Sequence, residues 1–248
     1  MRYYSIITLS FFLFTSCHSN EGEFSLKDWA VEGDSLSKIQ AYFFFEEIGG
    51  IDKWSELGAV HSKSTIFEPS FDSYQSEQWF SLEDTTLLLY TRKVNDYTIT
   101  QMLNGDEGWV SELKNASAMT DNTKKFMNYW HSMNFFNCIT KLARGKNLFI
   151  RFTADGYLYV LNEERENVLF GFKFESGSWL PTQFLRPMFN DQNISLIIDR
   201  WEMFDRLKVP MSMRTIDSVF IEALEEIELC KDMDCFDVQF TVDHMNSL

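Results

Sequence analysis

The chain has 248 residues, with 22 Lys and Arg against 37 Asp and Glu, giving a formal net charge of −15. That acidity excludes proteins that hold nucleic acid on basic stripes, and it excludes docking on anionic lipid through a basic patch. Aromatic residues make up 16% of the chain, whereas Pro and Gly are scarce. Large side chains in such numbers fill a heavily packed core or line an apolar cavity.

The chain begins with the layout of a secretory signal. Arg2 provides a positive start, and Ile6–Phe14 is an apolar run too short to cross a membrane, which takes about 20 residues. Phe14-Thr15-Ser16-Cys17 resembles a bacterial lipobox, with Phe where an aliphatic residue is usual. We expect residues 1–16 to be a lipoprotein signal peptide and Cys17 to carry lipid that holds the protein at the cell envelope, on the outer membrane, with the membrane face left open. The alternative is an ordinary secretory signal with an incidental cysteine.

Residues 17–33 are predicted to form a polar tether, and residues 34–248 one domain. Asp34 or Ser35 can cap a helix, because their oxygens accept the free N–H groups of a first turn. Apolar residues then recur at helical spacing as far as Gly49-Gly50, where glycine is the expected stop. A short second helix is predicted over Ile51–Leu57.

Alternation with a period of two then predicts an antiparallel meander, interrupted by one middle helix. The helix is predicted from Asp121 to Ala143, with Phe126, Trp130 and Cys138 on one face. The predicted strands before it are Val60–Glu68, Gln75–Leu82, Thr86–Lys93 and Tyr97–Leu103, with a short strand at Trp109-Val110.

Strands resume after the helix and complete the sheet. The clearest alternation places Phe170, Phe172 and Phe174 side by side, while Pro181 and Pro187 indicate an edge or a break. The predicted strands are Leu148–Thr153, Tyr157–Asn162, Asn167–Glu175, Trp179–Phe184, Ser195–Phe204, Met211–Ile216, Val219–Leu224 and Phe236–Val242. The fold class is therefore α+β, mainly antiparallel: a curled, unclosed half-barrel of about ten or eleven strands, with an N-terminal and a middle helix covering one face.

Cysteine spacing suggests one disulfide. Cys230 and Cys235 flank a short polar turn, so a bond between them could staple two strands in an oxidising envelope compartment. A metal site is disfavoured because no second Cys/His pair lies nearby. Cys138 sits in an aromatic helical stretch and is interpreted as a small buried apolar residue.

Catalytic signatures are absent from the sequence. No nucleophile elbow, zinc-protease helix, P-loop or dinucleotide fingerprint occurs, and the four histidines are isolated from one another. Asp232 and Asp234 could touch a cation, but two carboxylates make a poor calcium site. We expect a protein that is not an enzyme and that needs no cofactor or metal; a hydrolase without a recognised motif is the remaining catalytic alternative.

The aromatic residues suggest the functional feature. A curled sheet covered by a helix encloses an apolar interior, which could hold an acyl chain or could be a filled core that binds nothing small. The candidate lining residues are Trp79, Tyr90, Phe126, Trp130, Phe170, Phe172, Phe174 and Trp201.

The order of these features resembles a known family. The N-terminal helix, Gly49-Gly50, Trp54, the strands, the middle helix, Leu180-Pro181, and a strand from Leu196 to Trp201 that ends before Val209-Pro210 resemble envelope lipoproteins of the lipoprotein-carrier (LolA/LolB) type. The resemblance covers about residues 35 to 216 and implies an unclosed half-barrel whose helices cover an apolar cavity for lipid or lipoprotein acyl chains. It carries over no functional residue, and the C-terminal cysteine turn lies outside it.

Two functions follow as alternatives. The first is a membrane-anchored, non-catalytic protein that binds an apolar ligand, such as a lipid or an acyl chain. The second is a packed interaction module of an outer-membrane assembly with no small ligand. The first predicts a partner membrane through the N-terminal lipid and no nucleic acid, and neither identifies a protein partner.

Overall fold

The computed structural model describes residues 29–68, 71–112, 115–187, 193–217, 220–236 and 238–247. Cys17 and the predicted signal peptide lie outside the described residues. Trp29 and Val31, from the segment predicted as tether, are buried in the core.

The helices begin and end at recognisable caps. The carboxylate of Asp34 accepts a hydrogen bond from Ser37 N at 2.8 Å, and Gly49 ends the first helix in the left-handed conformation, which confirms the predicted boundaries. The helices are α1 (Ser35–Ile48), α2 (Ile51–Glu56), α3 (Asp121–Ser132), α4 (Phe135–Arg144), α5 (Val242–Ser247) and the single 3₁₀ turn η1 (Met233–Cys235).

The strands form one sheet of fourteen, in the order β1-β8-β9-β10-β11-β12-β13-β14-β2-β3-β4-β5-β6-β7. All neighbours are antiparallel except β1 and β8, and β1 and β7 end the sheet as unpaired edges within the described ranges. The strands are β1 (Glu32–Gly33), β2 (Ala59–Glu68), β3 (Phe71–Ser81), β4 (Leu87–Val94), β5 (Tyr97–Asn104), β6 (Glu107–Glu112), β7 (Asn115–Ala118), β8 (Leu148–Phe152), β9 (Tyr157–Asn162), β10 (Val168–Phe174), β11 (Pro181–Pro187), β12 (Asn193–Phe204), β13 (Leu207–Thr215) and β14 (Ile221–Cys230).

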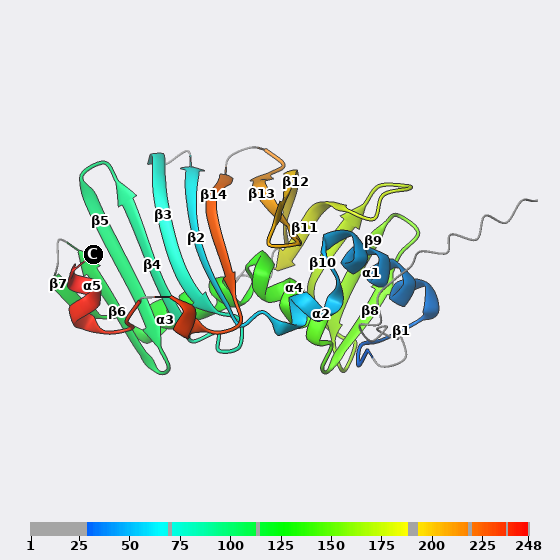
Figure 1. Cartoon of the computed structure of the whole chain (residues 1–248), viewed down its shortest axis with the longest axis horizontal. Coiled ribbons are helices and arrows are strands. Elements are labelled where there is room, and N and C mark those ends of the chain that lie inside the picture. Colours follow the sequence, from blue (N-terminus) through cyan, green and yellow to red (C-terminus); the bar gives the residue numbers. More distant parts are fainter. Residues whose placement is uncertain are drawn as a thin grey trace, which may run out of the picture.

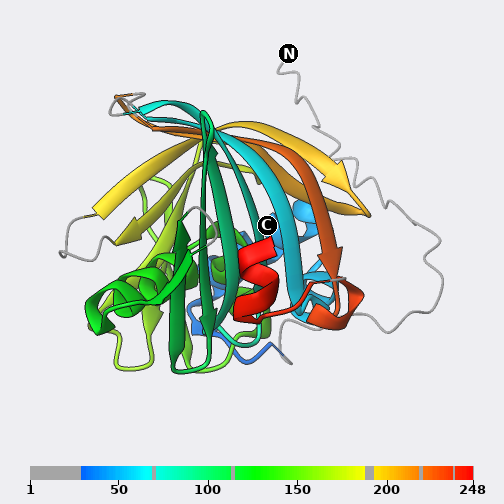
Figure 2. The ribbon, with the colours of Figure 1, turned by 90° about the vertical axis from the view of Figure 1, so that its left-hand side faces the viewer.

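The sheet is open and arched, and the helices α1 to α4 lie on its concave side (Figures 1 and 2). We call β8 to β13 the packed half and β14 with β2 to β7 the open half. The packed half is covered by α1, α2 and α4, whose apolar side chains join those of the strands in one core. Arg144 closes the end of α4 by donating hydrogen bonds to the carbonyl oxygens of Ser55, Leu57 and Leu82, which ties it to α2 and to the end of β3.

Helix α3 spans the concave side of the arch. Its Lys124 packs against Gly108 of β6 and donates a hydrogen bond to the carbonyl of Asp106, while the Tyr129 hydroxyl donates to the carbonyl of Pro187 at the end of β11. β6 and β11 are eight strand spacings apart, or about 38 Å along the sheet. A helix of 12 residues is only about 18 Å long, so the sheet must curl to bring both strands within its reach.

Three sequence predictions are wrong in detail. The sheet has fourteen strands rather than ten or eleven, and two of those not predicted, the two-residue β1 and the polar β7, show no apolar alternation. The middle helix is two helices: the side chain of Asn134 accepts a hydrogen bond from Asn137 N at 2.8 Å and starts α4 afresh. The segment with Pro181 and Pro187 is an internal strand, with proline tolerated at its first and last positions.

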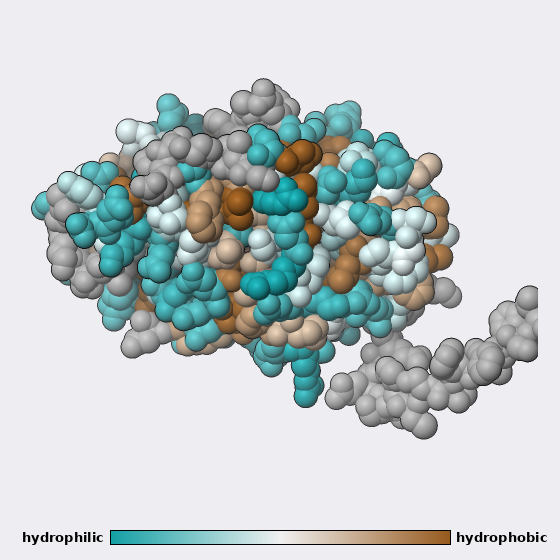
Figure 3. Space-filling model, turned by 90° about the horizontal axis from the view of Figure 1, so that it is seen from above, coloured by the Kyte–Doolittle hydropathy of each residue, from teal (hydrophilic) through white to brown (hydrophobic). Residues whose placement is uncertain are grey.

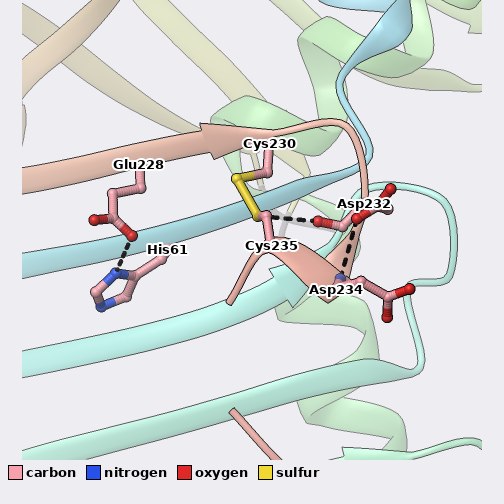
Figure 4. Close-up of a disulfide and its surroundings, with 6 residues drawn as sticks. All are labelled: His61, Glu228, Cys230, Asp232, Asp234 and Cys235. Carbon is pink, nitrogen blue, oxygen red and sulfur yellow. Dashed lines mark hydrogen bonds and ion pairs between the residues drawn. A yellow bond between two sulfur atoms is a disulfide. The ribbon is translucent and has the colours of Figure 1, made fainter. Parts of the chain in front are cut away.

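The predicted last strand, Phe236–Val242, is also wrong. The described part of this segment belongs to no strand, and it leads into α5. Its apolar residues pack instead on the convex face of the open half, where Met245 is buried against Leu89 and Met102. Cys230 and Cys235 form a disulfide at the start of this segment (Figure 4), with Cα atoms 6.4 Å apart. The bond joins the end of β14 to η1 rather than two strands.

Candidate functional site

The predicted lining residues do not share one space. Trp79 lies on the convex face, since Phe80 beside it points to the opposite, buried side and side chains alternate along a strand. Its ring stacks on His61 at 4.7 Å, and the C-terminal segment covers it in part. Trp79 is thus separated by the sheet from the other candidates.

Four candidates belong to the core of the packed half. Phe170, Phe172 and Phe174 are buried, and the Phe172 ring lies 5.2 Å from Phe44 of α1 and 5.5 Å from Phe184 of β11. Trp201 is partly buried against this core, with its ring 5.7 Å from Phe135 of α4. These rings fill the space between the sheet, α1 and α4.

Two candidates stand on the surface of α3. Phe126 and Trp130 are 49% and 42% exposed, and their rings stack at 6.3 Å. The sequence predicted that both rings share one helix face with Cys138. The break before α4 instead places Cys138 on a different helix, and the buried residues of α3 are Met127 and His131. An exposed aromatic pair on a helix that spans the arch is a feature of a ligand or partner site.

Tyr90 belongs to a polar group that we call the interior polar cluster, formed by inner-face side chains of the open half together with Arg186 of β11. The ladder pairs Glu222 with both Met213 and Ile66, and Ile66 with Tyr74, so the cluster follows one row across neighbouring strands. Charges link it further: Glu222 acts on Arg186 and Tyr90, and Arg92 acts on Tyr74 and Tyr90. The cluster consists of Ser64, Tyr74, Tyr90, Arg92, Arg186 and Glu222.

The tyrosines of this cluster keep their protons at ordinary pH. Their side chains are hydrogen-bonded to each other, and burial raises the pKa of Tyr74 to about 12 and that of Tyr90 further still. Burial also raises the pKa of Glu222, against the charge of Arg186 and a hydrogen bond of 3.3 Å donated by the Ser64 hydroxyl. The interior therefore holds protonated tyrosine hydroxyls, of which that of Tyr74 donates to Glu68 at 3.3 Å, beside charged groups whose ionisation is hindered by desolvation.

Arg186 is the most unusual member of the cluster. Its side chain is in phase with the buried Phe184 of β11 and is only 6% exposed, and its guanidinium lies 3.9 Å above the ring of Trp130. The Nε atom has no hydrogen-bond partner, and burial lowers the pKa of the group. Sequence reasoning missed this residue, although a charged side chain in phase with buried phenylalanine could have pointed to it.

His131 and Cys138 are buried, and burial keeps the imidazole neutral and the thiol protonated at neutral pH. Burial lowers the pKa of His131 to about 4, and its ring packs edge-on against Phe80 at 4.8 Å. Burial raises the pKa of Cys138 to about 12, so the thiol stays protonated. Both groups contribute to packing rather than to proton transfer.

Other site types find little support in the described ranges. No group of three or more His, Cys, Asp or Glu residues there could hold a metal ion. A cavity lined by Glu32, Asn147 and Phe149 lies beside β1 and β8. Its volume of about 80 Å³ is far smaller than the roughly 300–1,000 Å³ of ligand pockets. Among the helices described, none combines the length and apolarity needed to cross a membrane.

On the face seen from above, apolar residues lie among polar ones near the middle (Figure 3). Phe67 at the end of β2 and Ile216 directly after β13 are exposed at this end of the strands.

Comparisons with known proteins found structural likeness only. A domain described as an outer membrane lipoprotein-sorting protein from Vibrio parahaemolyticus is 9% identical with a TM-score of 0.42, over 74% of this chain and 92% of that one. A LolA superfamily protein from Nitrosomonas europaea is 10% identical with a TM-score of 0.44, over 78% and 96%. LprF from Mycobacterium bovis is 10% identical with a TM-score of 0.30, over 76% and 93%. No family model matches the chain, and no curated protein matches it.

All three likenesses are at low sequence identity and with TM-scores below 0.5. At these identities and TM-scores, its function has to be argued from its own residues.

Proposed function

We propose that this protein is a non-catalytic binding protein of the cell envelope that holds an apolar ligand, a lipid or an acyl chain, between α3 and the inner face of the open half. The observation that carries the proposal is the exposed Phe126–Trp130 stack on a helix with only two buried side chains. A helix so lightly embedded can move aside at little cost, and its aromatic pair can cover an acyl chain. Phe170, Phe172, Phe174 and Trp201 line this space only if α1 or α4 also shifts.

The anchor is a part of the same proposal. Lipid on Cys17 places the binding protein at a membrane, where apolar ligands enter and leave. An acidic chain lacks the basic patch that would replace such an anchor. Replacing Cys17 by Ser should release the protein from the membrane fraction, and unchanged retention would refute the anchor.

The ligand test uses a dansyl-labelled fatty acid with the protein after lipid extraction. We expect one probe per chain, displaced by unlabelled palmitate, with energy transfer from tryptophan. Trp130→Ala should weaken binding by about tenfold or more, since it removes an aromatic contact with the ligand. Absence of displaceable binding by the wild-type protein would refute the proposal.

A matched control exists away from α3, in the bend before β11. Trp179 is also 42% exposed and its ring lies 4.6 Å from Phe43 of α1, so Trp179→Ala removes an equivalent surface pair away from the arch. It should leave probe affinity unchanged. Equal losses in the two variants would show that the probe binds exposed aromatic surface without preference for α3.

A further inference from the structure

Arg186 is a buried cation with no described anionic partner. No ion pair or hydrogen bond within the described residues involves its guanidinium, and Nε has no acceptor. Taking an unpaired guanidinium out of water is strongly unfavourable, so buried arginines are normally paired and hydrogen-bonded. Within the described residues, this guanidinium therefore lacks an acceptor.

The contact with Trp130 does not satisfy those donors. The guanidinium lies over the ring at 3.9 Å, an arrangement that uses its flat face. The five N–H donors of arginine lie in the plane of the group and point away from its edge. They remain free to bind a planar or tetrahedral anion in a bidentate way.

Glu222 does not fill this role. Its charge acts on Arg186, but no ion pair within 4.0 Å joins them among the described residues, and its hydrogen bond comes from the Ser64 hydroxyl. Tyr74 and Tyr90 lie in the same cluster with protonated hydroxyls, and the Nε atom of Arg92 is also buried without a partner. The cluster thus holds two arginines whose Nε atoms have no partner. Its carboxylate Glu222 accepts from Ser64, and Glu68 beside it accepts from the Tyr74 hydroxyl at 3.3 Å.

We propose that Arg186 binds the acidic head group, a carboxylate or a phosphate, of an amphiphile whose chain lies under α3. This rests on the proposed function, because it places the head of the same ligand. Trp130 then contacts both ends of the ligand's site. Its ring holds the guanidinium that binds the head group, and its exposed edge adjoins the acyl chain. In a protein of net charge −15, an anionic ligand is repelled at long range, so its recognition depends on a local cation of this kind.

The first test needs no variant. Decanoic acid, monodecyl phosphate and decanol share a chain length and differ in the head, and their affinities can be compared by calorimetry at pH 7.5. We expect one or both acidic ligands to bind about tenfold to a hundredfold more tightly than the alcohol, as hydrogen bonds to charged groups suggest. Which acid binds better identifies the head group. Equal affinity of all three would overturn the role of Arg186 and leave the proposed function standing, whereas no binding of any would refute the proposed function.

Free anions separate a head-group site from a simple anion site. Acetate and inorganic phosphate lack the chain, so they should bind at least a hundredfold more weakly than the corresponding amphiphile. If inorganic phosphate binds as tightly as monodecyl phosphate, the amphiphile is overturned as the ligand.

Variants assign the preference to this residue. Arg186→Met should remove the preference for acid over alcohol, and Arg186→Lys should restore part of it, because ammonium keeps the charge but not the fork. Arg165 is the matched control, since its guanidinium also lies over a ring, that of Phe149 at 4.3 Å, but it is paired with Glu32 at the surface. Arg165→Met should leave the affinity ratio unchanged. An arginine that only positions α3 would, when replaced, weaken acid and alcohol equally, and that result would refute the proposal.

Discussion

The two halves of the sheet obey the same alternation but turn different side chains inward. In the packed half the inward positions carry aromatic or branched aliphatic side chains, and α4 packs on this core with eight buried residues of its own. In the open half they include the buried Ser62, Ser64 and Ser76 beside apolar core residues, and α3 buries only two side chains. Burial on both sides of an interface makes a rigid core. A polar strand face under a helix with few buried side chains allows that helix to move and a ligand to enter or leave. Stability should thus reside in the first half, and the chain of the ligand should bind against the second.

The largest expected effect tests where stability resides. Phe172→Ala removes a buried ring between Phe44 and Phe184 and should lower the free energy of unfolding by about 3–5 kcal/mol. Phe126→Ala, at a ring that is 49% exposed, should change it by less than about 1 kcal/mol. Urea unfolding followed by circular dichroism measures both. Similar losses in the two variants would remove the distinction between the halves.

Local features of the fold could be predicted from the sequence. Asp34 and Gly49 correctly bounded α1, and the alternation of Phe170, Phe172 and Phe174 correctly gave a buried strand. These features are local, because caps and periodicity act within a few residues. The unclosed, mainly antiparallel sheet followed from the same signals.

What failed depended on contacts distant in sequence. The alternation of Phe236, Val238 and Phe240 is real, but the segment packs on the convex face without joining the sheet, and a period of two cannot tell those cases apart. Arg186 could not be recognised as a site residue from local sequence, because its guanidinium stacks on Trp130, which lies on a helix more than fifty residues earlier. Aromatic content alone could not divide the candidates between core, convex face and α3.

The disulfide fixes the segment that covers the convex side of the open half. The loop-entropy relation for the few residues between Cys230 and Cys235 predicts a loss of about 2 kcal/mol when both are replaced by Ser. Denaturant unfolding of the double variant, and of the wild type with dithiothreitol, measures this. Cys138→Ala under the same reductant is the control for the buried thiol. A stability insensitive to reduction would show that the segment is held by its apolar contacts alone.

His131 lies where the open half meets α4, and it makes stability depend on pH. Burial lowers its pKa to about 4, so below the usual value near 6.5 the unfolded chain binds a proton that the folded protein does not. Stability should therefore fall as pH drops from about 6.5 to 4, with about 2 kcal/mol lost by pH 5. Urea unfolding at pH 7.5 and pH 5.0, compared with His131→Gln, isolates this loss from that of the carboxylates. An identical pH dependence in both proteins would contradict the buried neutral imidazole.

The smallest expected effect comes from removing the N-caps of α3 and α1, which tests whether each helix unfolds locally or only with the whole protein. Thr120 caps α3 and Asp34 caps α1, each accepting a hydrogen bond from a backbone N–H, at 3.2 Å and 2.8 Å. Replacing either by Ala should destabilise its helix by about 1 kcal/mol. For Asp34→Ala we expect this loss in global unfolding, because α1 is part of the packed core.

For Thr120→Ala the loss should appear locally instead. Hydrogen exchange of α3 amides should speed up by about fivefold, the factor that 1 kcal/mol gives, while the urea midpoint hardly moves. The same variant should release the dansyl probe faster, since opening of α3 would limit release. If Thr120→Ala lowers the urea midpoint as much as Asp34→Ala and leaves probe release unchanged, α3 belongs to the cooperative core. The ligand would then have to enter elsewhere along the arch.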